Sequence, residues 1–358
     1  MNLGRSMRGA GVGLAVLLAA IFPARSQEPE PPAVRAVPVT SEVFEAADAR
    51  ALERYVADPG VVRRMVDALV CRVAGAQEVG DAWRRLVRPG ERIGIKVGVG
   101  AAPLGGVHVE VVEAILAGME RGGIARGSVV VWDRDEAALK RAGMTPARLR
   151  CRVAWIPADG SGFDEKHFFT APILGSLIHG DLLFPRTRGA DRGSPDNLSN
   201  RSHLSRLLVS DLDRVVQVAP VTHSRLTGVA GALAGMTVPN VDNWRRFFQG
   251  GRAGDPFIPE IYSDPAVGGR VVLHFLDGLI VQYAGGPEFD PNHAVHHGAL
   301  YASVDPVALD GVALARINEY RVATKFPLVG ADARHLVTAE EMGLGNLNPR
   351  AVRLVGVR

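Results

Sequence analysis

The chain has 358 residues, of which 47% are hydrophobic and 22% are charged, enough for one large folded domain or two smaller ones. Residues 1–26 hold three of its 41 basic residues and none of its 38 acidic residues, so the rest of the chain carries no net charge. A neutral chain without a basic stripe excludes nucleic acid as an expected partner.

The first 26 residues predict a cleaved export signal. Arg5 and Arg8 precede an apolar run at residues 11–22, and residues 24–26 have the small-x-small form of a signal peptidase site. The run is shorter than the roughly 20 residues of a membrane-spanning helix. We therefore expect a periplasmic or extracellular protein with no membrane anchor after cleavage, in which residues 27–40 form a proline-rich linker.

Two cysteines, Cys71 and Cys151, leave two alternatives open in an exported chain. Either they form one disulfide, which such a compartment permits, or they are two buried thiols. Because the chain has no set of four cysteines, we expect no self-contained iron–sulfur cluster.

The apolar periodicity after the linker predicts an α/β fold with a mostly parallel, doubly wound sheet and helices on both faces. Helical patterns cover residues 41–56 and 59–74. A first βαβ unit then follows, with a strand at 92–97, a glycine-rich turn at 98–106, a helix at 107–121 and a strand at 128–132. A connection of that length favours parallel pairing with a right-handed crossover.

The remaining pattern predicts further alternation of strands and helices within a single domain, residues 41–358. Residues 157–206 contain clusters of Pro, Gly and Asn, which indicate an irregular insertion or an active-site loop. The other expected elements are helices at 136–142, 226–236, 241–248 and 306–320, and strands at 152–156, 214–221, 270–276, 299–304 and 352–357.

Five expected strands end at a polar residue able to do chemistry. These residues are Lys96, Asp133, His223, Asp277 and Asp305. In an open α/β sheet, ligands bind beyond the carboxyl ends of the strands, so the five would converge on one site if their strands were parallel neighbours.

Lys96 precedes a glycine-rich turn in which Gly98 and Gly100 would let backbone amides approach a phosphate or carboxylate. Asp133 would hold a ribose if the ligand were a dinucleotide, which makes a nucleotide-dependent oxidoreductase one alternative. The glycine spacing matches neither the dinucleotide fingerprint nor a Walker loop. A flexible strand-to-helix turn without a ligand is the other alternative.

His223 and Asp277 are the expected acid–base or metal-binding residues. A histidine at a strand end serves as base, metal ligand or anion partner, and Arg225 would orient an anionic substrate. Asp277 precedes Gly278 with no evident helix to cap. Asp305 precedes Pro306, the usual start of a helix, so helix capping is its leading explanation.

The histidines at 293, 296 and 297 form a cluster that suits a divalent transition metal, with His223 and Asp277 as further ligands. A histidine-rich surface loop explains His293, His296 and His297 equally well. Asn243 lies just before an arginine pair and either binds a carboxylate-rich ligand or caps a helix.

The ordered set of Lys96, Thr222-His223, Thr227-Gly228, Asp277-Gly278, Gly285-Gly286-Pro287 and residues 303–310 resembles the domain of unknown function 362 family over roughly residues 90–358. The resemblance implies an α/β core. This chain lacks the ferredoxin-type cysteines of some members. It also has Val97-Gly98 where the family shows Pro-Asn, Val221 in place of a lysine, and Leu233-Ala234-Gly235 in place of Leu-Lys-Asn.

From these residues we expect a metal- or cofactor-assisted enzyme that acts on a small anionic substrate at the carboxyl edge of the sheet. Lys96, His223 and Asp277 would carry the chemistry. The alternative is a periplasmic ligand-binding or accessory protein that uses the same pocket without catalysis.

Overall fold

A computed structural model of the chain describes residues 38–182 and 197–357, which lie within one compact unit, Pro31–Arg358. The expected export signal, most of the proline-rich linker and residues 183–196 of the expected insertion lie outside the described residues. None of the helices in the described ranges is long and apolar enough to cross a membrane.

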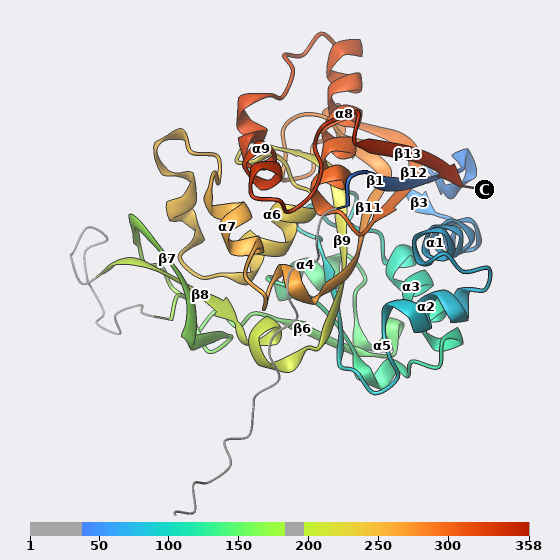
Figure 1. Cartoon of the computed structure of the whole chain (residues 1–358), viewed down its shortest axis with the longest axis horizontal. Coiled ribbons are helices and arrows are strands. Elements are labelled where there is room, and N and C mark those ends of the chain that lie inside the picture. The colour runs from blue at the N-terminus through green and yellow to red at the C-terminus, as the bar shows by residue number, and fades with distance from the viewer. Residues whose placement is uncertain (1–37, 183–196, 358) are drawn as a thin grey trace, which may run out of the picture. The chain divides into compact units, whose positions relative to one another are not determined.

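The central sheet has the strand order β13-β1-β12-β11-β9-β4-β5-β6, and β10 pairs with β9 outside that path (Figure 1). The strands are β1 (Ser41–Ala47), β4 (Ile93–Val97), β5 (Val129–Asp133), β6 (Arg152–Trp155), β9 (Arg214–Ser224), β10 (Gly228–Val229), β11 (Val271–Gln282), β12 (Ala294–Ser303) and β13 (Val352–Val357). Within the path only β12 runs antiparallel to its neighbours. The expected mostly parallel α/β sheet is therefore present.

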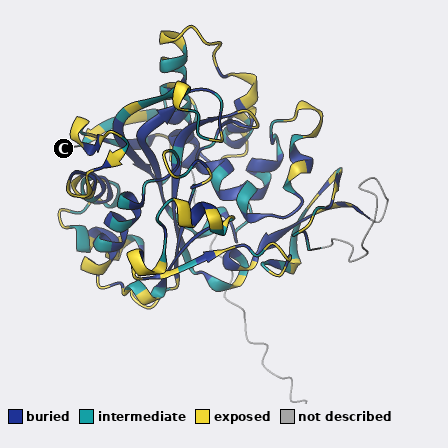
Figure 2. Cartoon of the chain, turned by 180° about the vertical axis from the view of Figure 1, so that it is seen from behind, coloured by how far each residue is buried: buried dark blue, intermediate teal, exposed yellow. Residues whose placement is uncertain are grey.

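Helices cover both faces of this sheet, as expected for a doubly wound fold. One face packs against α1 (Pro59–Ala74), α2 (Val79–Leu86) and α3 (Val109–Arg121). The other packs against α6 (Ala232–Thr237), α7 (Phe257–Tyr262), α8 (Pro306–Ala323) and α9 (Arg334–Glu341). Two short helices, α4 (Glu136–Arg141) and α5 (Pro146–Leu149), follow β5. Figure 2 shows the buried residues concentrated along the central strands.

Adjacent side chains of each strand supply the two cores alternately. In β4, Ile93 and Ile95 enter the core of α1–α3, whereas Trp132 of β5 enters the core on the opposite face. Side chains that alternate between two apolar cores explain why these strands read as continuous hydrophobic runs in the sequence. The two thiols are separate and free, and burial raises the pKa of Cys151 to about 11.

The neighbouring strands β4 and β9 mark a topological switch point. β4 leads through α3 to β5 on one side, whereas β9 leads through α6 and α7 to β11 on the other side. Since α3 and α6 lie on opposite faces, the two connections leave a crevice between them at the carboxyl ends of β4 and β9. Ligands of open α/β sheets bind at such crevices.

The prediction of a helix at residues 41–56 is wrong. This segment forms the sheet strand β1 and a small ribbon of β2 (Leu52–Glu53) and β3 (Val56–Ala57). Its Glu and Ala residues favour a helix locally, but β1 is inserted between β12 and β13. Pairing on both sides overrides the weak local propensity.

The irregular insertion expected at residues 157–206 instead contains an antiparallel strand pair, β7 (Phe163–Ser176) and β8 (Leu198–Ser205). The helix expected at 226–236 is shorter than predicted, because Gly228–Val229 pairs with β9 and α6 begins only at Ala232.

Candidate functional site

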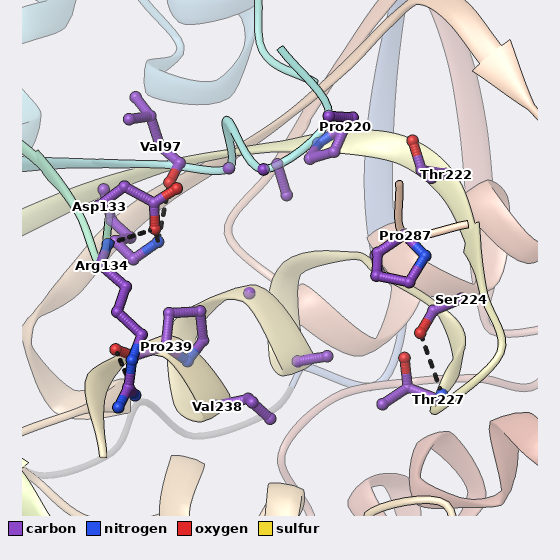
Figure 3. Close-up of a pocket in the computed structure, with 18 of the residues that line it drawn as sticks. Val97, Asp133, Arg134, Pro220, Thr222, Ser224, Thr227, Val238, Pro239 and Pro287 are labelled. Carbon is purple, nitrogen blue, oxygen red and sulfur yellow. Dashed lines mark hydrogen bonds and ion pairs between the residues drawn. The ribbon is translucent and has the colours of Figure 1, made fainter. Parts of the chain in front are cut away.

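A cavity of about 320 Å³ lies at the switch point between β4 and β9 (Figure 3). The end of β4, the β5–α4 connection, β9 and α6 all contribute to its wall. Most lining side chains are apolar. The polar and charged lining residues are Lys96, Asp133, Arg134, Asp135, Gln217, Thr222, Ser224 and Thr227. Of the residues singled out from the sequence, Lys96, Gly98, Gly100 and Asp133 line this cavity.

Lys96 and Asp133 form a buried ion pair at one end of the cavity. The Lys96 Nζ lies 2.8 Å from Asp133 Oδ1 and 2.8 Å from the Val97 carbonyl oxygen. Lys96 is 1% exposed and Asp133 is 7% exposed. An ammonium group has three protons, and only two have a protein acceptor among the described residues. The third proton has no protein acceptor there.

The Asp133 carboxylate, by contrast, already accepts three hydrogen bonds from the protein. Besides Lys96, Oδ1 accepts a hydrogen bond from the Arg134 amide at 2.8 Å, and Oδ2 accepts one from the Val99 amide at 3.0 Å. Asp133 therefore has little acceptor capacity left for the hydroxyl groups of a ribose, which was its expected role. The Val99 amide is also taken, so this part of the glycine-rich turn holds a protein carboxylate where an external anion was expected.

Arg134 adds a second cationic group to the same wall. Its NH1 donates to the carbonyl oxygen of Val241 at 2.6 Å, while Nε and NH2 have no acceptor in the described part of the chain. Burial lowers the pKa of Arg134, although an arginine stays charged at neutral pH. Figure 3 shows its side chain running along the cavity from Asp133 toward Pro239.

The opposite wall carries hydroxyl groups. Thr222, Ser224 and Thr227 lie there beside Pro287 (Figure 3). The Ser224 and Thr227 oxygens take part in local hydrogen bonds, whereas the Thr222 hydroxyl has no partner in the described ranges. Trp244 and Phe248, which line the cavity, form an edge-to-face pair with ring centroids 5.7 Å apart.

His223 lies beside the cavity but does not line it. Thr222 and Ser224 do, and since side chains alternate along a strand, His223 points to the other face of β9. Burial, reinforced by Arg321, lowers the pKa of His223 to about 4, and its Nδ1 has no hydrogen-bond partner in the described residues. The expected role of His223 as the base of this pocket is therefore not supported by its placement.

Asp277 also lies outside the cavity. β11 continues past it to Gln282, although the regular pairing with β9 ends at Asp277 opposite Pro220. Oδ2 accepts hydrogen bonds from the His108 amide at 2.7 Å and lies 2.9 Å from His108 Nδ1. Oδ1 accepts one from the Leu279 amide at 3.1 Å. The expected free carboxylate is thus fully engaged.

Asp305 is at the wrong edge of the sheet for this site. Because β12 is antiparallel to β11, its carboxyl end lies at the opposite edge from the ends of β4 and β9. Asp305 accepts hydrogen bonds from the Val307 and Ala308 amides at 2.9 Å each, which makes it the cap of α8. The capping alternative is confirmed.

The expected metal ligands are not brought together. His293 lies 2.8 Å from Asp290, His297 contacts the hydroxyls of Tyr320 and Tyr301, and His296 packs edge-to-face on Tyr55. His296 and His297 belong to β12, so they are not in a loop. Across residues 38–182 and 197–357, no group of three or more His, Cys, Asp or Glu side chains is placed to hold a metal ion.

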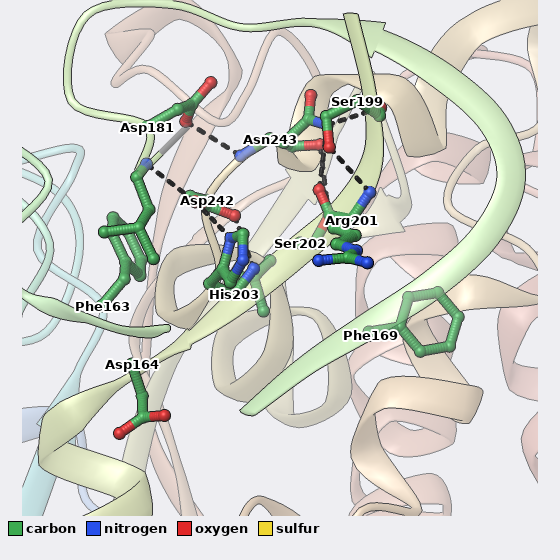
Figure 4. Close-up of polar contacts among 12 residues, drawn as sticks. Phe163, Asp164, Phe169, Asp181, Ser199, Arg201, Ser202, His203, Asp242 and Asn243 are labelled. Carbon is green, nitrogen blue, oxygen red and sulfur yellow. Dashed lines mark hydrogen bonds and ion pairs between the residues drawn. The ribbon is translucent and has the colours of Figure 1, made fainter. Parts of the chain in front are cut away.

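Asn243 and Arg246 hold the β7–β8 strand pair, and Figure 4 shows Asn243 beside Ser199 and Arg201. The Asn243 side-chain amide donates to the Ser199 and Arg201 carbonyl oxygens. The buried Arg246 guanidinium donates to the Ser202 hydroxyl and to three carbonyl oxygens of β7. Asn243 does not cap a helix through its side chain. Arg225 makes an exposed ion pair with Glu288 outside the cavity.

Sequence reasoning missed three residues that matter here: His108, Arg134 and Trp244. Arg134 directly follows Asp133 at a strand end, a signal that was available. His108 precedes the first turn of α3, but its partner Asp277 is 169 positions away. No local pattern reveals such a pair.

No family model matches the chain, and no curated protein matches it. Among solved structures it is similar to a protein from Thermotoga maritima, a Northeast Structural Genomics Consortium target. The TM-score is 0.39 and the sequence identity 11%, and the match covers 77% of this chain and 61% of that chain. The resemblance to the domain of unknown function 362 family stays a prediction from the sequence.

Proposed function

We propose that this chain is an exported binding protein for a small amphipathic anion, a molecule with an apolar ring system and one carboxylate, held in the cavity between β4 and β9. The proposal keeps the small anionic ligand expected from the sequence and favours binding over catalysis. The described lining residues include no histidine or cysteine, and the two carboxylates among them already accept hydrogen bonds from protein donors.

The observation that carries the proposal is the imbalance between free donors and free acceptors in the cavity. Asp133 already accepts three protein hydrogen bonds, whereas Lys96 and Arg134 keep charged N–H groups without a protein acceptor in the described residues. A ligand that brings an acceptor therefore satisfies these donors. An anionic acceptor gains most, because charge-assisted hydrogen bonds are about twice as strong as neutral ones.

The rest of the lining supports an apolar ligand body. Residues such as Val218, Ala234 and Val238, with the Trp244–Phe248 pair, leave most of the wall without polar groups. A volume of about 320 Å³ suits a ligand of one or two rings, since ligand pockets are mainly apolar with a few placed polar groups.

Isothermal titration calorimetry with a matched ligand panel tests the proposal. The probes are naphthalene-2-carboxylate, its neutral carboxamide, and acetate, which has the charge without the ring. We expect the naphthoate to bind at least about tenfold more tightly than the carboxamide, a difference in binding free energy of about 1.4 kcal/mol. We expect acetate not to bind measurably. Recovery of unchanged naphthoate by mass spectrometry tests the absence of turnover.

A double variant, Lys96→Met with Asp133→Asn, removes the donor and its buried counter-charge together, so that no unpaired charge is left behind. It should lower naphthoate affinity about tenfold more than carboxamide affinity, because any change in the backbone that Asp133 holds affects both ligands alike. The matched control is Lys140→Met with Glu136→Gln, an exposed ion pair on α4. Equal affinity for the acid and the amide would refute the anionic ligand, and binding of neither would refute the pocket.

A further inference from the structure

One wall of the cavity is formed by the wall loop, residues 98–107, which joins β4 to α3. Gly98, Gly100 and Ala101 of this loop line the cavity. The two ends of the wall loop are tied to each other, because the Val107 amide donates to the Gly98 carbonyl oxygen at 3.0 Å. Any movement of its second end therefore reaches the residues that line the cavity.

A carboxylate holds each end of the wall loop. Near the first end, the Val99 amide donates to Asp133 at 3.0 Å. Just beyond the second end, the His108 amide donates to Asp277 at 2.7 Å. The two aspartates come from β5 and β11, on either side of the β4–β9 pair. Residues expected to act on a ligand thus fix the backbone that surrounds it.

The two anchors differ in the cation beside the carboxylate. Asp133 is paired with a lysine, whereas Asp277 is paired with the His108 imidazole, whose Nδ1 lies 2.9 Å away. The Asp277 side chain is completely buried and that of His108 is 11% exposed. A buried carboxylate needs a charged partner and hydrogen bonds to offset its desolvation.

We propose that His108 and Asp277 are positioning residues that couple the protonation of His108 to the geometry of the wall loop, so that ligand affinity falls as the solution becomes alkaline. This inference rests on the proposed function, because it concerns the same cavity. His108 does not line the cavity and acts only through the backbone that it holds.

The direction of the effect follows from the groups that face the imidazole. Burial by itself lowers the pKa of His108, whereas the charge and hydrogen bond of Asp277 and the charge of Glu110 raise it, and the balance is upward. The imidazolium therefore persists to a higher pH than in an ordinary histidine and is lost as the pH rises through that raised value. A neutral imidazole leaves Asp277 buried with neutral donors only, which weakens the anchor.

The test measures naphthalene-2-carboxylate affinity by calorimetry from about pH 6 to about pH 9, where only groups with perturbed or histidine-like behaviour titrate. We expect the affinity of the wild type to fall about fivefold over this range. This is the effect expected when the hydrogen bond between His108 and Asp277 loses its charged donor. His108→Asn should give a flat profile near the alkaline wild-type affinity. His296→Asn, which removes an exposed histidine, should keep the wild-type profile.

Amide hydrogen exchange of the wall loop, corrected for the intrinsic pH dependence, provides a readout that needs no ligand. Protection should fall with pH in the wild type and stay constant in His108→Asn. A loop whose protection does not depend on pH overturns the inference whether or not the naphthoate binds. Failure of the naphthoate to bind a pH-responsive loop overturns the proposed function instead.

Discussion

Replacing His335 with leucine is expected to make the protein less sensitive to acid. His335 lies in α9, is completely buried, and neither ring nitrogen has a hydrogen-bond partner among the described residues. Burial lowers its pKa to about 4, from an ordinary value of 6.5. The folded chain therefore keeps His335 neutral at a pH where the unfolded chain takes up a proton.

A histidine whose pKa is lower in the folded state contributes stability that is present above the unfolded value and is lost as the pH falls toward the folded one. At about pH 5 the solution is roughly 1.5 pH units below the pKa of the histidine in the unfolded chain. Each of these units favours the unfolded state by about 1.4 kcal/mol. His335 alone then costs about 2 kcal/mol of stability relative to about pH 8.

Two further histidines act in the same direction. Burial lowers the pKa of His274 to about 3, where it bridges Gln217 and the Tyr262 hydroxyl, and burial with Arg321 lowers that of His223 to about 4. With His335 they amount to about 6 kcal/mol, which is comparable with the 5–15 kcal/mol that holds a typical domain together. We expect marked acid destabilisation of the wild type.

Urea unfolding followed by circular dichroism at about pH 8, 6.5 and 5 provides the measurement. The difference in unfolding free energy between His335→Leu and the wild type should grow by about 2 kcal/mol in favour of the variant as the pH falls over this range. His296→Asn is the control, because its side chain is exposed, and its difference from the wild type should stay constant. A constant difference for His335→Leu as well would refute the reasoning.

Three substitutions test the packing around the site. Arg246→Met should cost about 3 kcal/mol in urea unfolding, because it leaves β7 carbonyl groups unpaired, whereas Arg245→Met beside it should cost under about 0.5 kcal/mol. Gly286→Ala would place its Cβ against the His223 carbonyl and should lower the yield of soluble folded protein sharply. Asp310→Ala removes the acceptor of the first amides of α6 and should cost about 1–3 kcal/mol, measured by thermal unfolding. Unchanged stability in any of the three would contradict the contact concerned.

The direction of β12 shows where sequence reasoning stopped. The strands expected at 270–276 and 299–304 left a connection long enough for a parallel crossover. In the structure β11 runs to Gln282 and β12 begins at Ala294, so the connection is short and the pair is antiparallel. The apolar pattern of a strand gives no information on its direction. Because the predicted strands were too short, the connection between them looked long enough for a parallel crossover, and Asp305 was placed at the wrong edge of the sheet.

The parallel part of the sheet was predictable because its strands are buried on both faces and read as unbroken apolar runs. β4 and β5 fall where the sequence placed them, and so do Lys96 and Asp133 at their ends. Because β4 and β5 are neighbours in the sheet, the opposite charges at their ends lie close enough to form an ion pair. The partner of Asp277 did not follow, because His108 meets it only through the tertiary fold.

A polar residue at the end of a parallel strand has two uses, and its position does not distinguish them. It can face a ligand, or it can hold the loop that leaves the neighbouring strand. The unused hydrogen-bonding capacity decides between the two, because a buried carboxylate that already accepts several protein hydrogen bonds gains little from a ligand. By that criterion Asp133 and Asp277 hold the wall loop, while Lys96 and Arg134, which line the cavity, keep charged N–H groups without an acceptor among the described residues.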